Sequence, residues 1–211
     1  MTNWAMSVLI LAAFIAGALA YPHLPEKVPY HWNIRGEVDG YATPFWGAFG
    51  LPLLALAIYV LTALLPRIDP KRENYPRFRG PYRLIRLGIT SFLLLMQALI
   101  LMASLGLGVN LPLIVQLAVS LLIILLGSTM PKLAFNYFVG IRTPWTLADE
   151  EVWAKTHQVA GKLWIGGGIG GLLTALLPPP ANFIGFMVFI IGASLASIVY
   201  SYLAYREKVR S

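Results

Sequence analysis

Six stretches of mostly apolar residues follow one another along the chain, and short polar segments separate them. They cover about residues 4–21, 45–65, 84–107, 111–130, 163–178 and 183–203. Their interiors contain no Asp, Glu or His. Because a transmembrane helix needs roughly 20 such residues, the pattern predicts an all-α integral membrane protein with six transmembrane helices.

The fifth stretch is the weakest of the six. Between Leu163 and the proline run at 178–180 it has only about 15 residues, which make roughly 22 Å of helix. It must therefore begin deeper, lean on its neighbours, or continue from a helix that precedes it.

The polar segment before this stretch carries the signs of such a helix. Thr146, followed three residues later by Asp149, resembles a capping box with Asp in place of Glu. A helix from about residue 147 would place one aromatic and polar set on a single face: Trp153, Thr156, His157, Ala160 and Trp164. We expect a cytoplasmic amphipathic helix that lies on the inner membrane surface and then turns into span five.

The polar segment at 21–44 has the composition of a small folded cap. Pro25 and Pro29 favour extended or turn backbone, and Gly36 favours a turn. Asp39-Gly40 is a pair of the kind that closes a β-hairpin. Aromatic residues between them suit a headgroup region, so we expect a cap that lies against the membrane and not a floppy loop.

Composition excludes the soluble classes. Charged residues make up 12% of the chain and hydrophobic residues 58%, with a mean hydropathy of +0.70. Soluble domains carry about 25% charge and 45–50% apolar residues. The same numbers exclude a disordered chain, and the absence of cysteine excludes a disulfide scaffold.

Basic residues lie almost entirely on one side of the predicted spans. Seven Lys and Arg fall in 66–86, four in 130–163 and three in the tail, against two in 21–44. The positive-inside rule then predicts a multi-pass protein of the cell inner (plasma) membrane with both termini cytoplasmic and 21–44 external. The net charge of +7 is thus an orientation signal; we expect contact with the lipid bilayer, including anionic headgroups, and no direct nucleic-acid binding.

No constellation for catalysis or metal binding stands out. Possible ligands in the external segment are His23, His31, Glu26, Glu37 and Asp39, but their spacing matches no metal-site template. The chain has no Cys, and no Ser nucleophile is paired with a base. We predict no metal, no cofactor and no enzymatic activity, with a membrane-embedded metalloenzyme as the less favoured alternative.

A glycine-rich run in the fifth stretch mimics a nucleotide motif. Gly166-x-Gly168-x-x-Gly171 matches the dinucleotide fingerprint, but it lies inside an apolar stretch with no strand before it. The pairs Gly166/Gly170 and Gly167/Gly171 fit the small-x-x-x-small spacing of closely packed membrane helices. We expect helix packing at these positions, within the chain or in a homodimer.

Gln97 and Gln116 are the large polar side chains within the predicted spans. A buried amide there usually hydrogen-bonds to a neighbouring helix. A transport pathway usually needs ionisable residues or broken helices, so a transporter or permease remains an alternative with little support.

The two polar segments resemble known families. The external run resembles a domain of unknown function of the 1648 type, through Leu24-Pro25-x-x-Val28-Pro29-x-His31-Trp32-Asn33-x-x-Gly36-x-x-Asp39-Gly40-Tyr41. The second run resembles the signature of the SdpI family, through Gly140-Ile141-Arg142-Thr143-Pro144-Trp145-Thr146-Leu147, with Glu151, Trp153 and His157. We therefore divide the one membrane domain into a two-helix unit, 1–65, with the LPxxVPxHWN-type loop, and a four-helix SdpI-like region, 66–211, with the GIRTPWTL segment.

The resemblance implies immunity and signal transduction. The family is named for an immunity protein against a sporulation-delaying toxin. Such a protein protects the membrane from a secreted peptide toxin and tethers a cytoplasmic transcriptional repressor. We expect a site for a peptide toxin or envelope ligand at His31, Asn33, Gly36, Asp39 and Gly40. We expect the cytoplasmic output at Arg142, Thr143, Pro144, Trp145, Glu151, Trp153 and His157.

Overall fold

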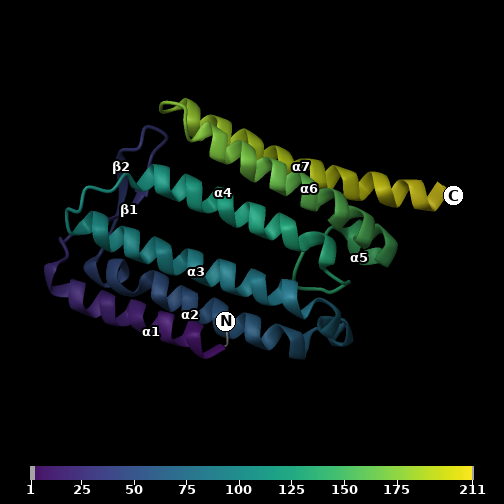
Figure 1. The fold of residues 1–211 in the computed structure, drawn as a ribbon, viewed down its shortest axis with the longest axis horizontal. Coiled ribbons are helices and arrows are strands. Elements are labelled where there is room, and N and C mark those ends of the chain that lie inside the picture. The colour runs from purple at the N-terminus through teal and green to yellow at the C-terminus, as the bar shows by residue number, and fades with distance from the viewer. Residues whose placement is uncertain (1–2, 211) are drawn as a thin grey trace.

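Helices that run side by side make up most of the molecule (Figure 1). The computed structural model describes residues 3–210. The long helices are α1 (Asn3–Ala20), α2 (Pro44–Ile68), α3 (Arg79–Ser104), α4 (Leu111–Thr129), α6 (Glu150–Thr174) and α7 (Ala181–Arg210). The short elements are η1 (Tyr21–His23), β1 (Val28–Trp32), β2 (Val38–Ala42), η2 (Arg72–Phe78), η3 (Met130–Lys132) and α5 (Pro144–Ala148).

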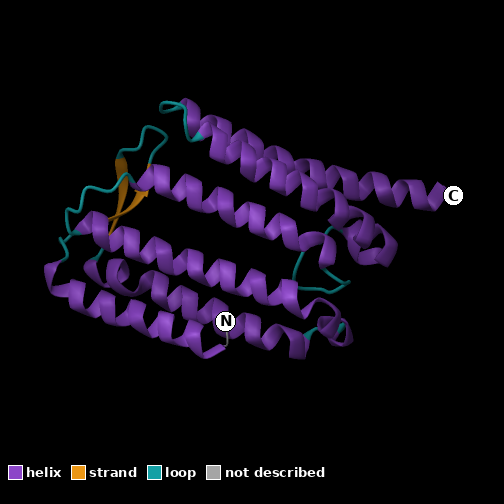
Figure 2. Cartoon of the chain, viewed as in Figure 1, coloured by secondary structure: helices purple, strands orange, loops and turns teal. Residues whose placement is uncertain are grey.

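The long helices form a row in which each packs on the next. The order is α1, α2, α3, α4, α6 and α7, and the row runs from bottom to top in Figure 1. The antiparallel hairpin of β1 and β2 lies at one end of the row, the hairpin end (Figure 2). The segments 69–78 and 130–149 and the C-terminus of α7 lie at the opposite end, the basic end.

Five helical segments of the described chain are long and apolar enough to cross a membrane. They are Trp4–His23, Pro44–Ile68, Arg72–Ser104, Leu111–Lys132 and Ala181–Arg210. The prediction of a helical multi-pass membrane protein is confirmed, although the segment 21–44 adds a small hairpin to the helices. The fifth predicted stretch, 163–178, is not among these five and is not a separate helix, because residues 163–174 are the second part of α6. It continues from a helix that precedes it, which was one of the predicted alternatives.

The start of α6 differs from the predicted capping box. Thr143, not Thr146, caps the short helix α5, and its partner in the capping box is the Thr146 side chain. Asp149 then caps α6, since its Oδ1 accepts from the backbone N–H groups of Glu151 and Val152 at 2.9 and 3.0 Å. Two consecutive helix starts therefore replace the single one that we predicted.

The prediction of an amphipathic helix on the membrane surface is also wrong. α6 runs without a break from Glu150 to Thr174. Its face with Trp153, Thr156 and His157 is buried inside the protein. This aromatic face covers the protein's own core at the basic end, and the helix continues directly into the glycine-rich stretch.

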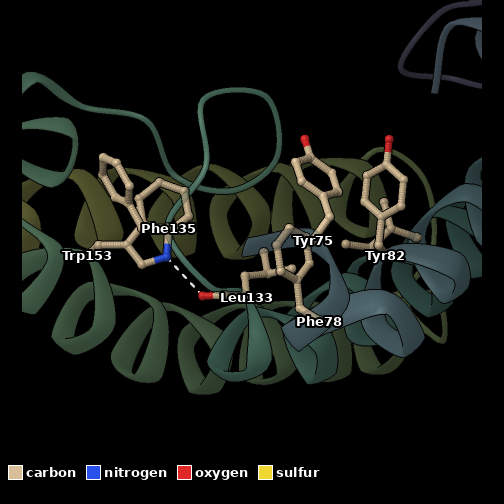
Figure 3. Packing of buried hydrophobic residues seen from close by; sticks show 7 residues of the cluster. Tyr75, Phe78, Tyr82, Leu133, Phe135 and Trp153 are labelled. Carbon is tan, nitrogen blue, oxygen red and sulfur yellow. Dashed lines mark hydrogen bonds between the residues drawn. The ribbon is translucent and has the colours of Figure 1, made fainter. Parts of the chain in front are cut away.

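A cluster of aromatic side chains forms the core of the basic end (Figure 3). Its buried members are Tyr75, Phe78, Tyr82, Ile85, Leu133, Phe135 and Trp153. Tyr82 also donates to the Thr62 carbonyl at 2.6 Å, which lacks its helical donor because Pro66 has no N–H. Burial of these rings joins η2, the start of α3, the segment after η3 and α6 into one unit.

Pro52 leaves a second carbonyl of α2 without its helical donor. The group concerned is the carbonyl of Ala48, four residues earlier. Gln97 of α3 replaces the missing donor, since its Nε2 lies 3.0 Å from Ala48 O and 3.0 Å from Gly47 O. The predicted hydrogen bond of Gln97 to a neighbouring helix is confirmed.

Candidate functional site

A cavity of about 690 Å³ lies beneath the hairpin. Its walls come from β1 and the hairpin turn, from α2, α3 and α4, and from the start of α7. Most of the lining is apolar, and the aromatic contribution comes from Tyr30, Trp32, Trp46, Phe92, Phe183 and Phe186. Its size and apolar character are those of a small-molecule or peptide side-chain site.

Two buried glutamines face this cavity. Gln97 and Gln116 are 2% and 6% exposed, and both line it. Gln116 Nε2 donates to Gly171 O at 3.0 Å and to Thr174 Oγ1 at 3.2 Å, which ties α4 to the end of α6. Gln97 donates to α2, but its Oε1 has no hydrogen-bond partner within the described chain. A buried carbonyl without a donor costs free energy, so the two hydrogen bonds of Gln97 to α2 are made at the expense of its oxygen.

The hairpin roof is fixed to the helices at both ends. Val28 at the start of β1 is fully buried against Gly47, where an added Cβ would lie 2.6 Å from Val28 Cγ1. At the other end, a Cβ added to Gly36 would lie 3.6 Å from Pro112 of α4. The roof therefore lies over the cavity, packed on α2 at one end and close to α4 at the other.

Asn33 organises the turn of the hairpin. Its Oδ1 accepts from the backbone N–H groups of Arg35 and Glu37, and its Nδ2 donates to Glu37 Oε2 at 2.9 Å. Gly36 completes the turn with a φ of +82°, which favours glycine. The Asp39-Gly40 pair does not close the hairpin; it lies inside β2, and our turn assignment was wrong.

The five residues that we predicted to bind an external ligand all lie in this hairpin, but only three of them line the cavity. His31, Asn33 and Gly36 do so. Asp39 lies in β2 with its carboxylate against His31 Nδ1. Gly40 pairs with His31 across the strands, and a Cβ there would lie 2.8 Å from His31 Cβ. Asp39 and Gly40 thus position the His31 ring and do not face the cavity.

Metal ligands do not converge. Within residues 3–210, no three His, Cys, Asp or Glu side chains form a group that could hold a metal ion. The metalloenzyme alternative therefore has no ligand set in the part of the chain that the structure describes.

His157 is a structural centre of the basic end. It is 1% exposed, its Nδ1 lies 2.8 Å from Trp153 O, and its Nε2 accepts from the Ile141 N–H at 2.9 Å. The neutral tautomer with the proton on Nδ1 satisfies both contacts. His157 precedes the apolar part of α6, and burial lowers its pKa to about 4, so the ring is neutral at physiological pH.

The turn before α5 lies close to the His157 ring. Gly140 has a φ of +123°. An added Cβ there would collide with His157 Nε2 and would also lie 3.1 Å from the Trp153 ring. Only glycine fits this backbone conformation and this space.

The other residues that we predicted for the cytoplasmic output, between Arg142 and Glu151, divide into buried and exposed groups. Thr143 is buried and donates to Ser201 Oγ of α7 at 3.0 Å. Trp145 is half-buried against the Tyr202 ring, with centroids 5.2 Å apart. Arg142, Pro144 and Glu151 are exposed. Much of the segment therefore attaches α5 to α6 and α7, and only part of it faces outward.

An ion-pair cluster joins the start of α6 to the end of α7. Lys208 Nζ lies 2.8 Å from Asp149 Oδ2 and 2.9 Å from Glu151 Oε2, and Lys155 Nζ lies 2.9 Å from Glu151 Oε1. The Lys208 ammonium holds the pKa of the Asp149 carboxyl below its usual range. Because these side chains are solvent-exposed, they orient the two helix ends and contribute little stability.

The glycine-rich part of α6 packs against two helices of the same chain. Gly167 and Gly170 face Phe189 of α7, whereas Gly168 and Gly171 face Ser120 of α4. Gly166 differs from the others, since an added Cβ there would meet nothing within 4 Å.

Asp69 holds two loops together through its carboxylate, and it was not among the residues that we predicted from the sequence. It is 2% exposed and accepts from the Tyr75 hydroxyl at 2.9 Å and from the backbone N–H groups of Tyr137 and Lys71 at 3.1 and 2.7 Å. It thereby joins the two loops of the basic end. The sequence offered one indication of this role, since Asp69 is one of only two acidic residues in the very basic segment 66–86.

Comparison with known proteins matches both polar segments. The SdpI/YfhL protein family matches residues 132–201, which cover α5, α6 and most of α7. Residues 8–56, which include the hairpin, match a domain of unknown function, DUF1648. The chain is 27% identical to the Immunity protein SdpI of Bacillus subtilis (strain 168) over 198 residues, which are 94% of this chain and 91% of that protein.

No solved structure shows a significant match to the chain. The two matched regions nevertheless hold both ends of the structure described above, the hairpin and the buried His157 segment. With the nearly full-length relative, they show that this chain is similar to SdpI-type membrane proteins.

Proposed function

We propose that the protein is an inner-membrane immunity and signal-transduction protein that binds a peptide toxin or another envelope ligand in the cavity beneath the hairpin. The observation that carries this proposal is the apolar cavity of about 690 Å³ with Gln97 and Gln116 in its wall. Apolar walls suit the side chains of a membrane-active peptide. The similarity to an immunity protein supports the same role, without enzymatic chemistry.

The proposed orientation places the hairpin end outside the cell. Fourteen of the sixteen Lys and Arg residues lie in 66–86, 130–163 and the C-terminal tail, and basic loops stay in the cytoplasm. α6 is then a sixth crossing, and both termini are cytoplasmic. A reporter enzyme fused after Asp39 should behave as external and one fused after Arg72 as cytoplasmic; the reverse pair of results contradicts this orientation.

α6 supplies a route from the cavity to the cytoplasmic side. Its end contacts Gln116, a cavity residue, and its start holds Trp153 and His157. A ligand that moves Gln116 therefore acts on a helix whose other end carries the second segment. The exposed Arg142 and Glu151 at that end are the proposed contacts for a cytoplasmic transcriptional repressor.

Filling the cavity should abolish protection. The double variant Gly50→Trp/Val115→Trp places two indoles in the lining. The matched control is Gly192→Trp/Val60→Trp, because Gly192 faces open space and Val60 is exposed on α2. Each gene is expressed in a Bacillus subtilis strain without its own SdpI, and survival is measured after exposure to the sporulation-delaying toxin and to a panel of purified membrane-active peptides.

We expect the native chain and the control to protect, and the cavity-filled variant to lose at least about 1.4 kcal/mol of binding, a tenfold loss of protection. Equal protection by the filled variant, at equal membrane abundance, contradicts the cavity as the site. Failure of the native chain against every peptide contradicts the immunity function. Peptide uptake that depends on the cavity, without protection, instead supports the permease alternative.

A further inference from the structure

A second hollow lies at the basic end, between the start of α3 and the end of α4. Its volume is about 500 Å³, and it is separate from the cavity under the hairpin. α3 contributes Gly80, Arg83, Leu84 and Leu87, and the other wall contains Ser128 and Lys132. None of the side chains that line this groove is acidic.

Two basic side chains, Arg83 and Lys132, lie on opposite walls of the groove, and neither forms an ion pair within residues 3–210. Arg83 and Lys132 are both exposed. Among residues 3–210, the ion pairs of the basic end involve Lys71, Lys155 and Lys208 instead. Arg83 and Lys132 therefore offer their positive charge to a ligand, and an anion between them would gain from both at once.

The rest of the groove is apolar and open. Leu84 and Leu87 follow Arg83 along α3 toward the middle of the helix, and Leu84 is 51% exposed. A Cβ added to Gly80 would meet nothing within 4 Å, so the groove is not closed at the start of α3. A charged mouth followed by an apolar slot has the polarity of a phospholipid, which carries its phosphate at the headgroup and acyl chains below it.

Ser128 adds a polar atom beside the cations. Its hydroxyl donates to Leu125 O at 2.7 Å, which leaves the Ser128 oxygen as an acceptor. α3 begins at Arg79 without a side-chain cap, so the positive end of its dipole also favours an anion nearby.

We propose that this groove is a binding site for one anionic phospholipid such as phosphatidylglycerol. Its phosphate lies between Arg83 and Lys132, its headgroup hydroxyl donates to Ser128, and an acyl chain covers Leu84 and Leu87. The site is on the proposed cytoplasmic side, where basic pockets between membrane helices bind anionic headgroups. It does not depend on the ligand that the hairpin cavity takes.

Retention of lipid on the purified full chain tests the site. The protein is exchanged into mixtures of phosphatidylglycerol and phosphatidylcholine, and bound lipid is counted by native mass spectrometry. Arg83→Gln/Lys132→Gln is compared with Arg206→Gln/Arg210→Gln, which removes the same charge from the exposed end of α7. We expect the groove variant to lose phosphatidylglycerol binding about tenfold or more and the control to keep it.

A third variant separates the groove from a diffuse charge effect. Leu87→Trp fills the apolar slot and leaves both cations in place, so we expect it to lower phosphatidylglycerol retention as well. Equal losses in the Arg206/Arg210 control, or no loss in Leu87→Trp, overturn the proposal in favour of general surface charge. Displacement of the lipid by millimolar inorganic phosphate also overturns it, because the groove would then recognise phosphate alone.

Discussion

Replacing Trp153 by alanine should lower the free energy of unfolding by about 3–5 kcal/mol, the usual cost of removing a fully buried aromatic side chain. The indole is 1% exposed and lies stacked on the His157 ring, with centroids 4.0 Å apart. It also meets Phe135 edge-on at 5.3 Å and donates from Nε1 to Leu133 O at 2.9 Å (Figure 3). The change leaves a cavity and a buried carbonyl without its donor.

Unfolding of the purified chain in mild detergent, followed by far-ultraviolet circular dichroism during heating or denaturant titration, measures this loss. Trp145→Ala is the matched control, since Trp145 belongs to the same segment but is only half-buried against Tyr202. We expect Trp145→Ala to lower the free energy of unfolding by about 1 kcal/mol. If the two variants lowered the free energy of unfolding by similar amounts, the full burial of Trp153 in the core would be contradicted.

The burial of Trp153 and His157 limits how the segment 140–157 could take part in the proposed signal transduction. Neither side chain can contact a partner while the basic end is folded, because both are about 1% exposed. A mutation at either position therefore acts through the fold. Loss of function at the exposed Arg142, with unchanged unfolding, would instead indicate a direct contact.

Hydrophobic pattern alone located the long helices because membrane burial depends on local composition. The second stretch, expected at 45–65, is α2 at Pro44–Ile68, and the fourth, expected at 111–130, is α4 at Leu111–Thr129. The hydrogen bonds of the buried glutamine amides were equally predictable, because an unpaired amide in an apolar environment costs free energy. Gln97 and Gln116 do bond to neighbouring helices.

Helix starts and the hairpin turn were less predictable, because several residues compete for each role. Thr143 caps α5 and Asp149 caps α6, whereas we assigned the N-cap to Thr146 with Asp149 as its capping-box partner. Thr143 is held in extended backbone next to Ser201, 58 positions away. In the hairpin, the Asn33 side chain organises the turn, so Asp39-Gly40 remains in the strand.

The cavity could not be foreseen from any local pattern. Its walls come from four helices and the hairpin, and one of its two glutamines, Gln97, lies between the two matched family regions. Sequence reasoning found the polar segment that roofs the cavity, but its convergence with α3 and α4 depends on the packing order of the row.

Gly168→Leu should disrupt the packing of α6 on α4, with a loss of stability of about 3 kcal/mol or more. A Cβ at this position would lie 2.6 Å from Ile124 Cγ1 and 2.7 Å from the Ser120 carbonyl oxygen. The second contact is with backbone, so the two helices must move apart before a larger side chain fits. Leucine is itself a better helix former than glycine, which means that a loss must come from the interhelical contact.

Gly166→Leu is the control, two positions away on the same helix, where an added Cβ would meet nothing within 4 Å. It should leave stability unchanged or raise it by up to about 1 kcal/mol through helix propensity. Because Gly168→Leu could fail to fold, Gly168→Ala provides the milder measurement, and we expect its melting temperature in detergent to lie below those of the native chain and Gly166→Ala. If Gly168→Ala were as stable as Gly166→Ala, the close approach of α6 and α4 at Gly168 would be wrong, and with it the rigid attachment by which α6 links the cavity to the basic end.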